Sequence, residues 1–198
     1  MNTYCTEKTH SGTTLTPVET SCFDNGILFI DGSITEETAT KFIQNGIVLA
    51  SKDIPLTVII NSNGGDLQAG LNIYDFILSL KDVTTVAIKA YSMGAVLFSA
   101  GSNRIITPHG QVMIHEPLLS SGVSGACSSV EAMSDVLKAK KVQIAQLLSK
   151  HTGKSIKELN KVMSKDTYFS AEEALKFGLC DSIQSWDKIL AKEEIYDQ

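Results

Sequence analysis

The chain has 198 residues, which is long enough for one domain with a buried core. Of these, 43% are hydrophobic and 20% charged, and this composition excludes an intrinsically disordered protein. Its 17 basic and 22 acidic side chains give a formal net charge of −5. Only Arg104 among the basic residues is an arginine, so an acidic chain with one bidentate cation is not expected to bind nucleic acid.

The first 25 residues are polar and rich in threonine, and the sequence predicts a mobile arm over residues 1–25. No basic segment is followed there by an apolar one, so we expect no secretory signal. No apolar run reaches the roughly 18 residues of a membrane span, so no membrane partner is expected. The four cysteines are widely spaced and fit neither a disulfide framework nor a zinc site. We therefore expect a cytoplasmic protein, or one of an equivalent reducing compartment, that uses no metal and no cofactor.

Short apolar runs predict the strands of the fold. We expect strands at residues 26–30, 56–60, 86–90, 104–107, 111–114 and 179–183. A Pro-His-Gly turn at 108–110 is predicted to separate the fourth strand from the fifth, and a charged tail follows the last.

Helices are predicted between these strands. Amphipathic or apolar segments begin near residues 67 and 92. Four further helices are expected where a serine stands three residues before a glutamate, as in a capping box, at Ser33, Ser128, Ser155 and Ser170. Alternating strands and helices favour an α/β fold with a parallel sheet, in a single domain over residues 26–198.

Three predicted strands end in residues that can carry chemistry. The pair Gly64 and Gly65 follows one strand, Ser92 another, and His115 a third. Reactive groups of parallel sheets gather at the carboxyl ends of strands, so we expect these residues to lie together. A serine between a strand and a helix presents its hydroxyl at a sharp turn. The N–H groups of Gly65 and Met93 could then form an oxyanion hole for acyl transfer.

Each of these residues also has a purely structural explanation. Glycines before a helix commonly form a turn, Ser92 could be a helix N-cap, and His115 could be a hydrogen-bonded residue at a strand end. Asp166, within the segment SKDTY at 164–168, could simply begin a turn. Spacing alone therefore leaves the chemistry open.

Several ordered blocks resemble the proteolytic subunit of the Clp protease, a self-compartmentalised serine peptidase. They are INSNGG at 60–65, YSMGA at 91–95, VMIHEP at 112–117, HTG at 151–153, DTYFSAEEA at 166–174 and GLCDSI at 178–183. The resemblance implies a crotonase-like fold, a spiral of ββα units with a parallel sheet. It also implies a projecting handle helix, which corresponds to about residues 118–152.

The resemblance implies a role for each candidate residue. Ser92 would be the nucleophile, His115 the general base and Asp166 the residue that orients the imidazole, while Gly65 and Met93 would supply the oxyanion hole. The subunit would hydrolyse peptides and unfolded polypeptides inside a homo-oligomer of two stacked heptameric rings.

An AAA+ unfoldase is the partner that the resemblance implies. The family's first amphipathic helix, ahead of the first strand, is not visible in residues 1–25. We therefore expect cleavage of short peptides without help and weak binding of an unfoldase.

Two other functions stay open at this stage. An acyl-CoA enzyme of the crotonase class would share the sheet and the oxyanion hole but would use carboxylates in place of a serine. A catalytically inactive ring scaffold would share the fold alone. Reaction of Ser92 with a fluorophosphonate distinguishes the peptidase from both.

Overall fold

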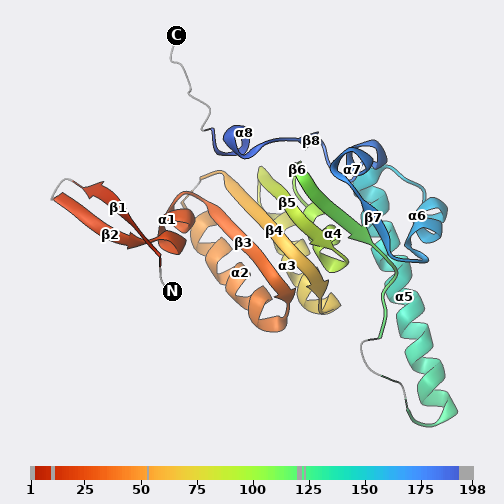
Figure 1. The fold of residues 1–198 in the computed structure, drawn as a ribbon. Coiled ribbons are helices and arrows are strands. Elements are labelled where there is room, and N and C mark those ends of the chain that lie inside the picture. Colours follow the sequence, from red (N-terminus) through yellow and green to blue (C-terminus); the bar gives the residue numbers. More distant parts are fainter. Residues whose placement is uncertain (1–2, 10–11, 53, 120–121, 123, 192–198) are drawn as a thin grey trace.

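A six-stranded sheet forms the centre of the computed structural model, which describes residues 3–9, 12–52, 54–119, 122 and 124–191 (Figure 1). Its strands are β3 (Ile27–Ile34), β4 (Leu56–Gly65), β5 (Val83–Tyr91), β6 (Asn103–Ile114), β7 (Thr167–Phe169) and β8 (Ser182–Ile183). The strands from β3 to β6 are parallel neighbours, and β8 pairs in parallel with β6. Only β7 is antiparallel, against the end of β6. The predicted α/β fold with a mostly parallel sheet is confirmed.

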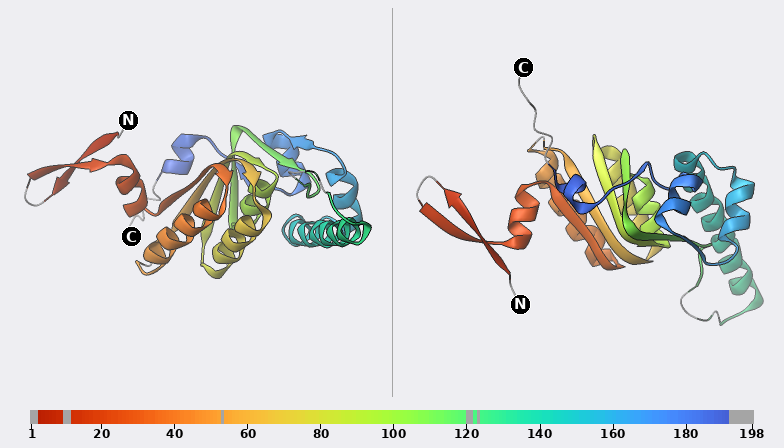
Figure 2. Two further views of the ribbon diagram at one scale, coloured as in Figure 1. Left: turned by 90° about the horizontal axis from the view of Figure 1, so that it is seen from below. Right: turned by 45° about the horizontal axis from the view of Figure 1, so that its top comes forward.

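Helices accompany the strands of this sheet. They are α2 (Glu36–Ala50), α3 (Leu67–Ser79), α4 (Met93–Ser99), α5 (Cys127–Thr152), α6 (Ile156–Met163), α7 (Ala171–Phe177) and α8 (Trp186–Leu190). Buried residues of α2 to α7 join those of the strands in one main core. Helices α2 and α3 lie side by side on one face (Figure 2). All residues of α4 are buried, which explains why its sequence is apolar throughout. No helix of the described residues is long and apolar enough to cross a membrane.

The long helix α5 projects from the body of the molecule, as predicted for the handle (Figure 1). Its buried residues, Ile144, Ala145 and Leu148, all lie in its second half. Val130 and Val136 in the first half are 43% and 54% exposed. The apolar stripe of α5 is therefore only partly covered by its own subunit.

The N-terminal segment corrects the prediction that no helix precedes the first strand of the sheet. Strands β1 (Tyr4–Thr9) and β2 (Gly12–Pro17) pair antiparallel as a hairpin, and α1 (Val18–Asp24) follows. Threonine is polar, but it is also β-branched and favours strands. Phe23 of α1 packs against the main core, so this segment has an anchor. Its mobility in solution stays a prediction.

Two of the four predicted capping boxes are wrong. Ser33 lies inside β3, and the N-cap of α2 is Thr35, whose hydroxyl accepts from the Thr38 N–H. Pairing of β3 with β4 continues through Ile34, and this holds Ser33 in an extended conformation. Helix α5 begins at Cys127 with no side-chain cap, one residue before Ser128.

The other two caps are confirmed. The Ser155 hydroxyl accepts from the Glu158 N–H. Ser170 and Glu173 exchange both bonds of a capping box.

Strand β6 also differs from the prediction, because residues 103–114 form one strand without a turn at 108–110. Its register against β5 shifts between Ala87 and Lys89, so the residues of the expected turn bulge out of the ladder. A Cβ atom at Gly110 would lie 2.8 Å from the Ala87 carbonyl oxygen, so only glycine fits this close approach. The expected charged tail likewise contains a short helix, α8.

Candidate active site

Ser92 occupies a strained turn between β5 and α4. Its φ of 54° and ψ of −119° lie in a region that favours glycine. Such a conformation costs about 1–3 kcal/mol and persists only when its surroundings enforce it. The Ser92 N–H donates to the Met113 carbonyl (2.8 Å), which fixes the turn against β6. The hydroxyl is thereby presented at the end of the sheet, as in a nucleophile elbow.

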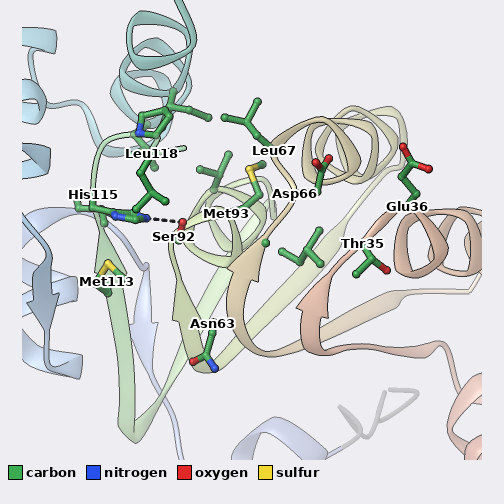
Figure 3. A pocket seen from close by; sticks show the side chains of 17 residues that line it. Thr35, Glu36, Asn63, Asp66, Leu67, Ser92, Met93, Met113, His115 and Leu118 are labelled. Carbon is green, nitrogen blue, oxygen red and sulfur yellow. Dashed lines mark hydrogen bonds between the residues drawn. The ribbon is translucent and has the colours of Figure 1, made fainter. Parts of the chain in front are cut away.

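His115 and Asp166 form a chain of close polar contacts with Ser92. His115 follows β6, and its Nε2 lies 2.7 Å from the Ser92 Oγ (Figure 3). Its Nδ1 lies 3.2 Å from the Asp166 Oδ1. The antiparallel pairing of β7 with β6 brings Asp166, just before β7, back to the end of β6. The His115 side chain is 14% exposed and that of Asp166 60%.

This arrangement of the three side chains is the one that nucleophilic catalysis by a serine requires. With the His115 Nδ1–H donating to Asp166, the Nε2 lone pair is free to accept the serine proton. The carboxylate also stabilises the imidazolium that forms when the proton moves.

The turn formed by the last residues of β4 packs directly against the serine. A Cβ atom at Gly64 would lie 2.7 Å from the Ser92 Cβ and 3.0 Å from the Met93 nitrogen, so the backbone needs glycine here. The Gly64 N–H is engaged, because it donates to the Ser62 Oγ (3.0 Å). Gly65 is therefore the candidate donor of this turn, opposite the Met93 N–H in the first turn of α4.

A cavity of about 780 Å³ opens beside Ser92 and His115 (Figure 3). Gly65 and Met93 also line it, while Asp166 lies behind the imidazole and does not. Its apolar wall includes residues of three helices and of β6: Leu67, Val96, Met113, Ile144 and Leu148. Ile144 and Leu148 come from α5, so the base of the projecting helix forms part of the cavity. This contribution of α5 could not be predicted from the sequence.

All five predicted site residues therefore lie around one location. Four line the cavity, and Asp166 reaches it through His115. In the sequence, Asp166 is far from the other four residues. In the fold, the three residues of β7 place it close to them.

A partly buried polar cluster at the C-terminal end of α5 was also missed. Arg104 donates to the carboxylate of Asp181 and to the carbonyls of His151 and Gly178. The Tyr74 hydroxyl lies 2.6 Å from the His151 Nε2. These bonds attach the end of α5 to α3, β6 and α7. The single arginine of the chain was the available signal.

Burial and neighbouring charges together shift the pKa of His151 and of Asp181. Burial, Lys150 and Arg104 lower the pKa of His151, since each disfavours the imidazolium. Burial by itself raises the pKa of Asp181, but the hydrogen bonds and charge of Arg104 outweigh it, and the pKa is lowered.

Comparison with known families adds one match. The model of the family described as Clp protease matches residues 11–186, which include every residue of the site.

Proposed function

Because the chain belongs to the Clp protease family, which makes it a serine-type peptidase subunit, we propose that Ser92, His115 and Asp166 are its catalytic triad. The observation that supports this best is the chain of two contacts, 2.7 Å from Ser92 to His115 and 3.2 Å from His115 to Asp166. The reaction is hydrolysis of a peptide bond through an acyl-enzyme.

In the first half of the reaction the Ser92 Oγ attacks the carbonyl carbon of the substrate, and its proton passes to the His115 Nε2. The carbonyl oxygen becomes an oxyanion that accepts from the N–H groups of Gly65 and Met93. When the tetrahedral intermediate collapses, the C–N bond breaks and Nε2 returns the proton to the leaving amine. Asp166 holds the imidazole and balances its charge throughout.

In the second half a water molecule takes the place of the amine. His115 removes a proton from the water, the hydroxide oxygen bonds to the acyl carbon, and the ester bond to Ser92 breaks. The Ser92 oxygen recovers the proton from Nε2, so the enzyme returns to its starting state. Peptides and unfolded polypeptides are the proposed substrates, because an extended chain can lie along the open cavity.

The nucleophile can be tested with a fluorophosphonate and a fluorogenic peptide. The wild type should be labelled once per chain, and Ser92→Ala should lose the label and about 10⁴- to 10⁶-fold of its peptidase rate. Ser51→Ala is the matched control, because Ser51 is an exposed serine at the end of α2. Peptidase activity that survives in Ser92→Ala would contradict the proposal. An unlabelled wild type would point to an acyl-CoA enzyme if it turns over such a thioester, and otherwise to an inactive scaffold.

We propose further that the subunit assembles into two stacked heptameric rings that enclose the active sites. The exposed apolar residues of α5 support this proposal, because burying them on another subunit would stabilise the assembly. They are Val130, Met133, Val136 and Val142, at 43%, 40%, 54% and 48% exposure. Light scattering at micromolar concentration should give the mass of fourteen subunits, and Val136→Glu should reduce it. A monomer mass for the wild type would contradict the proposal.

An AAA+ unfoldase is the proposed partner that supplies ATP-dependent unfolding. The hairpin of β1 and β2 and the helix α1 support a docking role for the N-terminal segment, and the reason to expect weak binding, the missing helix, no longer holds. Deletion of residues 1–17 should leave peptide cleavage unchanged and abolish unfoldase-driven degradation of a folded substrate. Equal degradation by both proteins would exclude this segment as the docking element.

The cytoplasm, or an equivalent reducing compartment, is the proposed location. The wide spacing of the four cysteines supports it. Detection of the protein in a secreted fraction would contradict it.

A further inference from the structure

Two tyrosines connect the strand that carries Ser92 with the strand next to Asp166. Tyr91 is the last residue of β5, directly before Ser92, and Tyr168 is the middle residue of β7, two after Asp166. Their rings meet edge to face, with centroids 5.4 Å apart and an interplanar angle of 88°. This is the geometry in which aromatic pairs attract each other.

The contact crosses a whole strand. Met113 of β6 is the register partner of Tyr91 on one side and of Tyr168 on the other, so the three residues form one row across the sheet. Neighbouring strands lie about 4.8 Å apart, so β5 and β7 are separated by about twice that distance. Only long side chains reach over Met113, and two tyrosines do so. The Tyr91 hydroxyl also donates to the Gln111 Oε1 (2.5 Å), which holds its ring in place.

Asp166 depends on such support more than the other members of the triad. Ser92 is held by its backbone bond to Met113, and the His115 side chain is mostly buried. Asp166 stands outside the ladder, is 60% exposed and touches His115 through one contact of 3.2 Å. Its position is set by β7, which has only three residues. A small shift of β7 would therefore separate the carboxylate from the imidazole.

We propose that Tyr91 and Tyr168 are a positioning pair, which holds β7 against β5 and thereby keeps the Asp166 carboxylate on His115. The inference rests on the proposed function, because it assigns the pair a role through the triad. Other bonds also hold this region, among them the Thr167 hydroxyl donating to the Val162 carbonyl (2.8 Å). The pair differs from these in joining the nucleophile strand directly to the aspartate strand.

The test is a double-mutant cycle on the assembled protein, with kcat and KM measured on a short fluorogenic peptide. Tyr168→Ala should lower kcat by roughly two- to tenfold, the range expected for the loss of an edge-to-face contact, with little change in KM. Tyr168→Phe keeps the ring and should restore kcat. In the Asp166→Asn background, which should itself cost about 10⁴-fold, Tyr168→Ala should change kcat by less than about 1.5-fold.

Trp186→Ala is the matched control, because Trp186 on α8 is also an exposed aromatic residue, at 40%. It should leave kcat unchanged. If Tyr168→Ala does not fold, Tyr168→Leu replaces it, since leucine keeps bulk and removes the ring.

Two outcomes would overturn the inference: an unchanged kcat in Tyr168→Ala, or an equal loss in both backgrounds, which would show a general effect on stability. Neither bears on the proposed function, which is tested separately by fluorophosphonate labelling of the wild type and by peptide cleavage in Ser92→Ala.

Discussion

The strained turn at Ser92 leads to a prediction about stability that is opposite in sign to the usual effect of glycine. Replacing Ser92 by glycine or by alanine removes the same hydroxyl and the same hydrogen bond to His115. The two variants differ in the backbone, because glycine adopts a φ of 54° with a ψ of −119° without strain and alanine does not. Their difference in unfolding free energy therefore measures the strain at the nucleophile.

The magnitude follows from two opposing terms. Relief of the strain stabilises Ser92→Gly by about 1–3 kcal/mol, and the greater freedom of glycine in the unfolded chain costs about 0.4–1 kcal/mol. We expect Ser92→Gly to be more stable than Ser92→Ala by about 1 kcal/mol, or roughly 2–4 °C in Tm for a chain of this size. Urea unfolding and thermal scans at equal protein concentration measure it, and neither variant should cleave peptides. A Ser92→Ala protein as stable as Ser92→Gly would refute the idea that strain is stored at this turn.

The remaining predictions concern the surroundings of the site. Gly64→Ala should abolish peptide cleavage, because its Cβ would meet the Ser92 Cβ at 2.7 Å, and fluorophosphonate labelling would reveal a competent serine if this reasoning is wrong. Arg104→Ala should lower the unfolding free energy by about 1–3 kcal/mol, since it leaves two partly buried carbonyls and a carboxylate without their charged donor. Arg104→Lys should lose less, and equal losses in urea unfolding would contradict the role of the planar guanidinium. The lowered pKa of His151 means that the unfolded chain takes up a proton more readily than the folded one, so stability should be present above about pH 6.5 and should fall as pH drops from there towards the folded pKa. His151→Gln should flatten this part of the curve of unfolding free energy against pH. An unchanged slope would contradict the role of His151 in this pH dependence.

Much of the fold could be predicted because its strands and helix ends depend on local patterns of neighbouring residues. Apolar runs such as that ending at Ile60 mark strands that are buried on both faces, and Ile60 is fully buried. Ser155 and Ser170 cap their helices as predicted, since capping needs only residues within one turn. The prediction that Ser33 caps a helix was wrong, because pairing between distant strands outweighed its local preference for an N-cap.

The candidate site divides in the same way. A glycine pair and a serine, each between a strand and a helix, are local signals, and Gly65, Ser92 and Met93 could be chosen from them. The position of Asp166 could not be derived locally, because a strand of three residues has no measurable periodicity and its partner lies far away in the chain.

The sequence by itself therefore determined the parallel strands β3, β4 and β5, most of the helices and the serine turn, because burial periodicity and capping are properties of neighbouring residues. Only the tertiary structure decided which distant segments meet: β7 with β6, Tyr91 with Tyr168, and Arg104 with His151. The physical reason is that these contacts depend on the path of the whole chain, which brings together side chains that share no local pattern.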